Sequence, residues 1–435
     1  MATKNMIESR IIGMILCLTL IFATASGHDY TPGESQKNPI LLKGGNIYTV
    51  SGEMMEQSDI LFENGLISAI GTNLSLPENT EVIDVTGQNV YPGMIASNTS
   101  IGLIEIGAVT VTDDRNELGQ NNPDVQSHIA YNPDSEIIPV TRSNGITTAL
   151  IVPSGGLLRG QSSLLYLDGW TKEDAMVKQS LALHMNWPRI SIVTAWWMDK
   201  SAEEQKKENA ENIEKIYKIF DEAVEYRKAK MANPKLKTDS KMEAMMPVFS
   251  GDLPVFVHAN DLRQIESAIA FAKKYQFKIV LVGGKEAWKI TDLLIENKIP
   301  VILGKTQSNP MRQDDDYDIS YKLPKLLSDA GVKYCLSYGS ASNTRNLPFQ
   351  AGQAVAFGLS KEEALKTVTL FPAQILGVDN MLGSLEVGKS ATIIVSSGDL
   401  LDILGNDITL EFIAGKTVNL DNRHKEFYRK YRAKN

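Results

Sequence analysis

The stretch 254–304 decides the fold, because strand-like and helix-like segments alternate along it. It contains, in order, PVFVHAN, DLRQIESAIAFAKKY, KIVLVGG, KEAWKITDLLIENK and PVILG. The short segments are apolar and rich in β-branched residues, and the long ones repeat apolar residues at helical spacing. YKLPKLLSDAG and KYCLSYG continue the alternation to residue 339. Repeated strand–helix–strand units require a parallel sheet. An open doubly wound sheet and a closed barrel both satisfy this pattern.

The middle of the chain extends the same pattern toward the N-terminus. ITTALIVP (146–153) reads as a buried strand, and QSSLLYLD (161–168) alternates like one arm of a hairpin. Residues 201–230 are charged, with one apolar face at helical spacing, and predict a long exposed helix. Residues 92–378 are therefore long enough for an α/β fold of the eight-stranded (β/α)8 TIM-barrel type.

Two β-rich segments flank this middle region. Residues 40–91 read as short strands separated by Gly-Gly and Asn-Gly turns, and residues 379–420 contain a second such series. Each segment alone buries too little apolar surface to be stable. We therefore expect the two segments to form one small composite β-sandwich.

The ends of the chain predict export. Residues 1–27 combine Lys4 and Arg10 with an uncharged apolar run and small residues, as in a secretory signal peptide, although a membrane anchor is the alternative. We expect cleavage, a flexible lead-in over 28–39, and a periplasmic or secreted protein without a membrane span. The basic tail 421–435 is expected to be an exposed helix.

Composition excludes several classes of function. The 435 residues include 44 basic and 52 acidic side chains, a net charge of −8, which argues against nucleic-acid binding. Two cysteines cannot build a disulfide framework, and Cys335 lies in an apolar run that predicts a buried core residue. Five histidines limit the metal chemistry that is available.

Three pieces of sequence carry a family resemblance. They are YPGMIASNTS (91–100), the strand-end His258, and GLSKEEALKTVTLFPAQILGVDNMLGSLEVGKSATIIV (358–395). Together they resemble the amidohydrolase superfamily, in its imidazolonepropionase-like branch. The resemblance spans nearly the whole chain after the signal peptide. It implies a barrel flanked by a small β-sandwich, and hydrolysis of non-peptide C–N bonds by water that one or two divalent metals activate.

The metal ligands that this resemblance implies are mostly replaced here. The family's first-strand His-x-His corresponds to Asn98 and Ser100, and its fifth-strand histidine is retained as His258. Its sixth-strand histidine falls on Gly283, and its eighth-strand aspartate falls on Gly339 or, with a one-residue slip, Ser340. The fourth strand cannot be placed, so a bridging role for Lys200 or Lys241 would be a guess. We therefore predict no normal zinc site, and a zinc ion only if the family site persists in an altered form.

The resemblance and the strand ends also indicate which residues could line a site. His258 is either a pocket residue that acts as an acid, a base or a ligand-binding group, or a hydrogen-bonded structural residue. His128 and His184 are expected to be structural. A substrate-binding role is predicted for residues near the strand ends: Asn98, Ser100, Asn260, Arg345 and Asn346.

Two acidic segments could have a catalytic or metal-binding role, but a solvated surface loop is the simpler interpretation of each. The first follows the first barrel strand and supplies carboxylates for acid–base work: Glu105, Asp113, Asp114 and Glu117, beside Arg115. The second, residues 313–318, has four aspartates without the spacing of a calcium loop, and we expect it to be solvated. The glycines of PSGGLLRGQSS (153–163) indicate a turn before the hairpin.

Two functions remain open from the sequence. The first is an exported hydrolase of the amidohydrolase type with a degenerate metal site. The second is an inactive pseudoenzyme that binds a small ligand in the barrel mouth or partners an active homologue. A small-molecule ligand or substrate is expected in both cases, and homo- or hetero-oligomerisation is left open.

Overall fold

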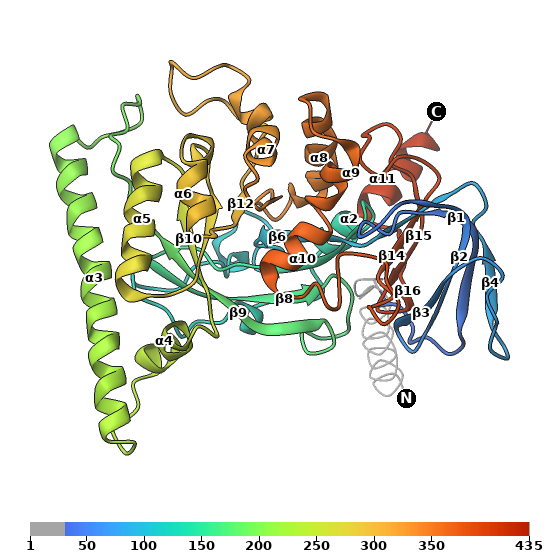
Figure 1. Ribbon diagram of the computed structural model, residues 1–435, viewed down its shortest axis with the longest axis horizontal. Coiled ribbons are helices and arrows are strands. Elements are labelled where there is room, and N and C mark those ends of the chain that lie inside the picture. Colours follow the sequence, from blue (N-terminus) through green and yellow to red (C-terminus); the bar gives the residue numbers. More distant parts are fainter. Residues whose placement is uncertain (1–30, 435) are drawn as a thin grey trace, which may run out of the picture. The chain divides into compact units, whose positions relative to one another are not determined.

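The computed structural model describes residues 31–434, so the predicted signal peptide (1–27) and residues 28–30 of the predicted lead-in lie outside the described residues. Two eight-stranded sheets organise the chain from Gly33 onward (Figure 1). Within the described residues, no helix combines the length and the apolarity that crossing a membrane requires.

The first sheet joins both ends of the chain. Its strands are β1 (Ile40–Ile47), β2 (Met55–Glu63), β3 (Leu66–Gly71), β4 (Glu81–Asp84), β5 (Asn89–Pro92), β14 (Ile393–Ser396), β15 (Ile408–Ile413) and β16 (Lys416–Thr417). Their order is β16-β15-β14-β5-β1-β2-β3, with β4 also paired to β1. The N-terminal and C-terminal segments meet where β5 pairs antiparallel with β14.

A bend in β1 makes this a single continuous sheet. The first half of β1 pairs with β4 and its last residues pair with β5, with the register broken between Leu42 and Gly45. Gly44 has a φ of 75°, and a Cβ on Gly45 would lie 2.8 Å from a methyl of Val90. The paired glycines therefore let the strand bend over a core that includes Phe62, Phe412 and neighbouring aliphatic side chains.

The second sheet is the barrel. Its strands are β6 (Met94–Thr99), β7 (Ile146–Ile151), β8 (Leu158–Tyr166), β9 (Met176–Asn186), β10 (Val255–Ala259), β11 (Ile279–Gly283), β12 (Val301–Leu303) and β13 (Tyr334–Leu336), which neighbour one another in chain order. The predicted barrel is confirmed with one departure from the parallel pattern. Strand β8 runs antiparallel to both β7 and β9, as the hairpin reading of 161–168 anticipated.

A short connection bridges the seam of the barrel between β6 and β13. Ile95 N of β6 donates to the carbonyl of Val368 at 2.8 Å, and Leu336 N of β13 donates to the carbonyl of Thr367 at 3.1 Å. The next helix, α10 (Leu370–Leu376), contributes Ala373 and Leu376 to the apolar cluster inside the barrel. The family-like block TVTLFPAQILG is therefore a structural part of the barrel wall.

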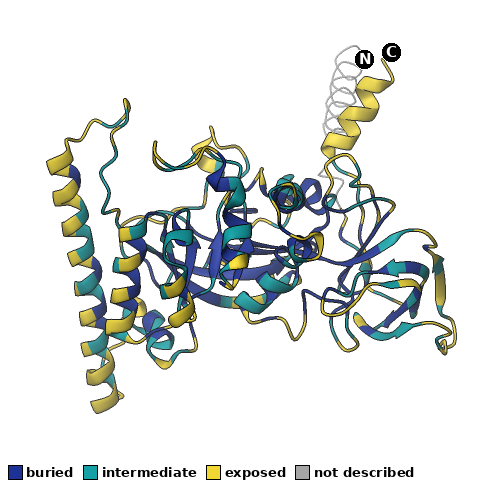
Figure 2. Cartoon of the chain, turned by 45° about the horizontal axis from the view of Figure 1, so that its top comes forward, coloured by how far each residue is buried: buried dark blue, intermediate teal, exposed yellow. Residues whose placement is uncertain are grey.

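Helices cover the outside of the barrel, and their buried faces pack on its strands (Figure 2). Predicted helices appear as α3 (Ala202–Ala232), α5 (Leu262–Tyr275) and α7 (Ile319–Asp329). The other helices are α2 (Ile137–Arg142), α4 (Ser240–Ser250), α6 (Thr291–Glu296), α8 (Leu347–Ala356), α9 (Lys361–Lys366) and α11 (Arg423–Arg432). Helix α11, in the basic tail, buries none of its residues.

Candidate functional site: the barrel mouth

The mouth of the barrel is where the carboxyl ends of the parallel strands meet. In barrels of this kind, functional side chains lie at that end. Because β8 is reversed, it presents its first residues there instead of its last. The register places Leu158 opposite Met185 and Gly160 opposite His184, near the end of β9. Asn186, the last residue of β9, lies opposite His258 of β10.

Two histidines form a directly hydrogen-bonded pair at this mouth. His184 Nδ1 lies 2.9 Å from His258 Nε2. His184 is fully buried, packs edge-on against Phe256, and has no partner for its Nε2 among the described residues. His258 is only partly buried. Burial, and then the nearby charge of Arg159, hold the pKa of both imidazoles well below its ordinary value, so both rings are neutral at pH 7.

The charge beside this pair comes from Arg159, in the second position of β8. Its Nε donates to Oδ1 of Asn186 at 2.9 Å, and its Nη2 donates to the same oxygen. The Asn186 amide is held in this orientation because its Nδ2 donates to the carbonyl of Gly156 at 2.7 Å. Burial lowers the pKa of Arg159 to about 10, and no acid of the described residues opposes that shift. A guanidinium with this pKa is still charged at neutral pH.

Gly283, the residue predicted at the sixth-strand ligand position, lies beside Asn260. Gly283 has a φ of 103°, and a Cβ placed on it would lie 2.6 Å from Asn260 Oδ1 and 3.0 Å from the carbonyl oxygen of Ala259. The Asn260 side chain thus lies over the glycine that the resemblance aligns with a histidine. The backbone there is held by Gly284 N, which donates to Ala259 O at 2.8 Å.

A second asparagine lies over a second glycine on the opposite side of the barrel. Gly339 N, just after β13, donates to Asn98 O at 3.1 Å, and a Cβ on Gly339 would lie 3.6 Å from Asn98 Nδ2. Ser100 is buried, and its carbonyl accepts from Leu103 N at 3.0 Å. Side-chain amides therefore lie at two of the positions where the family places ligands.

These donors do not suit the divalent metal that the family implies. Within residues 31–434 there is no group of three or more histidine, cysteine, aspartate or glutamate side chains arranged to hold an ion. The two imidazoles use facing nitrogens to bond each other, and the adjacent charge is a guanidinium, which repels a cation. A normal zinc site needs about four nitrogen, sulfur or carboxylate donors.

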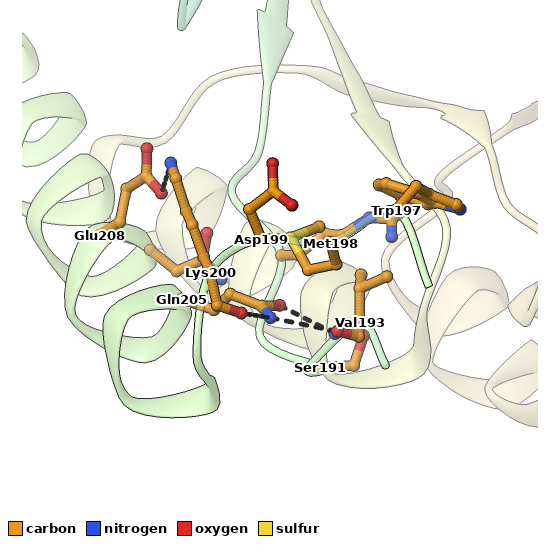
Figure 3. Close-up of a pocket in the computed structure, with 10 residues that line it drawn as sticks. Ser191, Val193, Trp197, Met198, Asp199, Lys200, Gln205 and Glu208 are labelled. Carbon is orange, nitrogen blue, oxygen red and sulfur yellow. Dashed lines mark hydrogen bonds and ion pairs between the residues drawn. The ribbon is translucent and has the colours of Figure 1, made fainter. Parts of the chain in front are cut away.

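The end of β9 leads into a cavity of about 520 Å3 (Figure 3). It is lined by the connection to α3 and by the first turns of that helix, including Arg189, Ser191, Trp197 and Lys200. Gln205 of α3 holds the connection: its Oε1 accepts from Val193 N at 2.9 Å and its Nε2 donates to Val193 O at 3.1 Å. Lys200 is paired with Glu208 at 2.5 Å, away from the strand end.

The loop after β11 is held by a buried carboxylate. Glu286 accepts from Leu262 N at 2.7 Å, from Lys289 Nζ at 2.9 Å and from the guanidinium of Arg312. Burial raises its pKa, but these donors outweigh burial and lower the pKa to about 2. Lys289 also pairs with Asp315 at 3.0 Å. The expectation of a merely solvated loop at 313–318 was therefore wrong for this aspartate, which anchors the loop.

Other predicted residues lie away from the histidine pair. Asp113 is paired with Arg115 through two 2.7 Å contacts, which lower the pKa of Asp113 and make it a poor general base. Arg345 and Asn346 lie in the short turn η4 (Thr344–Asn346), where Asn144 Nδ2 donates to Arg345 O at 2.9 Å. Their binding role stays a prediction.

The other residues singled out from the sequence near the first barrel strand and β9 have partners of their own. Glu105 accepts from Asn132 at 3.3 Å, Glu117 accepts from the next backbone amide, and the Asp114 backbone bonds Leu103. Lys241 lies on α4 and donates to Asn121 O, so neither suggested bridging lysine is on the fourth barrel strand, β9. His128 bonds Ser163 and Gln179, and a structural role fits it.

Sequence reasoning missed three members of the mouth cluster: Arg159, His184 and Asn186. His184 was expected to be structural, yet it is in direct contact with His258. A signal existed in ALHMN, whose polar residues at alternate positions end an apolar strand. Arg159 had no comparable signal, because its place depends on the direction of β8.

Known proteins share this architecture. The model of the amidohydrolase family matches residues 318–420. A solved amidohydrolase from Thermotoga maritima MSB8 is 27% identical, with a TM-score of 0.79, covering 87% of this chain and 99% of that one. Amidohydrolase tasK of Hapsidospora irregularis is 22% identical over 79% of this chain, and dihydropyrimidinase of Dictyostelium discoideum is 29% identical over 42%. The matches cover only 38% and 31% of the lengths of those two curated relatives. With the barrel, its flanking composite sheet and the C-terminal block, these similarities make the chain a member of the amidohydrolase superfamily.

Proposed function

We propose that this protein hydrolyses a non-peptide C–N bond of a small molecule at the barrel mouth, without the family's metal pair. The hydrogen-bonded pair of His184 and His258 carries the proposal, because it places a neutral imidazole at a strand end. The relatives named amidohydrolase and dihydropyrimidinase support the reaction class.

His258 is the member of the pair that can reach a ligand, because His184 is fully buried. When Nε2 of His258 donates to Nδ1 of His184, Nδ1 of His258 keeps a lone pair. That nitrogen takes a proton from water as the water oxygen bonds to the acyl carbon. The proton then passes to the leaving nitrogen as the C–N bond breaks, and His258 is again neutral. General base catalysis contributes about 10²–10⁴-fold, and the lowered pKa of His258 makes it a weak base, so we expect slow turnover.

Ring opening of 5,6-dihydrouracil by the purified chain tests this proposal, alongside a linear acyl amide. We expect slow hydrolysis that is unchanged by a chelating agent and lost in His258→Gln. His128→Gln is the matched control, since His128 is also a buried histidine with a lowered pKa but lies outside the mouth cluster. Activity that a chelator removes and zinc restores would contradict metal-free chemistry. Full activity in His258→Gln would exclude His258 as the base.

A ligand-binding role without turnover is the second candidate, and the donor set at the mouth favours it. A charged guanidinium, two neutral imidazoles and two amides suit binding better than activation of water. This pseudoenzyme would act alone or beside an active homologue. Saturable binding of a small molecule with no product, in the same assay, would select it.

Export remains part of the proposal. Residues 1–27 motivate it, and N-terminal sequencing of the mature protein is expected to begin near Ser26 or His28. An intact Met1 in a soluble cytoplasmic fraction would contradict export.

A further inference from the structure

Four cations gather at the barrel mouth without acidic partners. Arg159 is the second residue of β8, Arg189 follows β9, Lys285 follows β11 and Lys305 follows β12. Among residues 31–434 these four side chains take part in no ion pair, although most basic residues of the helices do pair. The chain carries a net charge of −8, so an excess of basic residues does not explain this grouping.

Lys285 is the half-buried member of the outer three, and Arg189 and Lys305 are exposed. Burial lowers the pKa of Lys285, and the positive charges of Arg189 and Lys305 lower it further. A half-buried ammonium beside two like charges is stabilised by an anion, because water alone compensates it poorly. Two acids at this end are already occupied: Glu286 is held by Arg312 and Lys289, and Asp261 caps α5 and accepts from Ser191. Asp199 lines the same cavity as Arg189, but the two form no ion pair.

Arg159 is the inner cation and the most strongly desolvated one. Its two bonds go to one neutral oxygen of Asn186, which fixes the guanidinium plane but leaves Nη1 and one N–H of Nη2 without a partner among the described residues. A guanidinium presents such N–H groups as a fork that matches a carboxylate. The neutral imidazole of His258 lies close enough for the Arg159 charge to affect it.

We infer that the mouth binds a small organic carboxylate, with Arg159 as its inner anchor and Arg189, Lys285 and Lys305 as an attracting rim. This inference rests on the proposed function in one respect only: hydrolysis of an acyl C–N bond releases a carboxylate beside His258. Binding itself needs no turnover, so the site serves a hydrolase and a ligand-binding protein alike.

The cavity of about 520 Å3 can hold the organic part of a ligand whose carboxylate binds at the mouth. Arg189 belongs to the rim and also lines this cavity together with Trp197, so a ligand held by the rim has this cavity for its remaining part. Trp197 is 57% exposed and offers apolar area at the cavity edge. The occupant that fits is therefore an anion with an apolar or amide-bearing portion, of the size of a small metabolite.

Calorimetric binding of succinate to the whole purified protein, with its neutral isostere succinamide for comparison, tests the inference. We expect succinate to bind, succinamide to bind much more weakly, and Arg159→Met to weaken succinate binding about tenfold or more. Arg159→Lys should retain part of the affinity because it keeps the charge and loses the fork. Arg423→Met is the control, since Arg423 is an exposed arginine beside Glu136, far along the chain.

The urea midpoint of each variant without ligand shows whether a loss of succinate binding comes from the binding site or from a loss of folding. Arg159→Met should unfold at a midpoint no lower than the unsubstituted protein, because it removes a buried unpaired charge. Equal succinate binding by Arg159→Met, or equal binding of succinamide, would overturn the inference. Binding of inorganic phosphate with no binding of succinate would overturn the carboxylate assignment. Failure of dihydrouracil hydrolysis leaves these outcomes unaffected, because succinate has no bond to hydrolyse.

Discussion

Substitution of Gly283 by alanine tests whether the sixth-strand ligand position has been rebuilt. A Cβ there would meet Asn260 Oδ1 at 2.6 Å and Ala259 O at 3.0 Å, on a backbone with a φ of 103°. A side chain in such a conformation costs about 1–3 kcal/mol, and crowding of this kind adds about 1–3 kcal/mol. We expect Gly283→Ala to lower the free energy of unfolding by about 2–6 kcal/mol, measured by urea denaturation.

The matched control isolates crowding from backbone strain. Gly388 also has a positive φ, 88°, but a Cβ there would meet no atom within 4 Å. Gly388→Ala should therefore cost only the strain. Adding Asn260→Ala to Gly283→Ala should recover part of the difference, since the contact with Ala259 O remains. If Gly283→Ala costs no more than Gly388→Ala, the asparagine does not occupy this position, and Gly283→His could restore the family ligand.

Three further predictions concern charges near the mouth. Because the folded-state pKa of His184 and His258 is lowered, the unfolded chain binds more protons than the folded chain below pH ~6.5. The free energy of unfolding should therefore fall by about 1.4 kcal/mol for each histidine per unit decrease in pH. Between pH 7 and 5.5, the urea midpoint of His184→Gln should fall less than that of the unsubstituted protein. Glu286→Gln should lower the free energy of unfolding by about 3 kcal/mol at pH 7, because the folded state lowers the pKa of Glu286 from 4.5 to about 2. This contribution should disappear as the pH falls from 4.5 to about 2. An unchanged urea midpoint at pH 7 would show that the ion pair with Arg312 does not stabilise the loop. Arg159→Met should raise the pKa of His258 while leaving it below the ordinary value, because burial remains the larger cause; a proton NMR titration that shows no change would place the guanidinium away from the pair.

Much of the barrel could be predicted because its signals are local. The segments from β10 to β12 each show their own periodicity, and the capping residue Asp261 marks the start of α5. His258 was found by its place after an apolar strand. The sequence predicts that Gly283 stands at the sixth-strand ligand position, but the approach of the Asn260 side chain to that glycine depends on three-dimensional packing.

The rest of the site could not be predicted because it depends on strand direction. The pattern of β8 indicates a strand, and no local feature of PSGGLLRGQSS shows which end of that strand meets the mouth. A parallel β8 would place Arg159 at the opposite end of the barrel. The pairing of Gly160 with His184 is a long-range contact, and it decides whether a glycine-rich turn contributes a charge to the site.

Strand reversal also links the two departures from the family pattern. A divalent metal requires a mouth with negative potential, which histidines and carboxylates supply, whereas Arg159 makes the potential positive. The guanidinium of Arg159 beside His184 and His258 would repel a metal cation at the mouth. Metal-binding side chains at the other strand ends would then have no cation to stabilise. The predicted ligand replacements at Asn98 and Gly283 and the position of Arg159 therefore favour the same proposal, a mouth that binds anions and not cations.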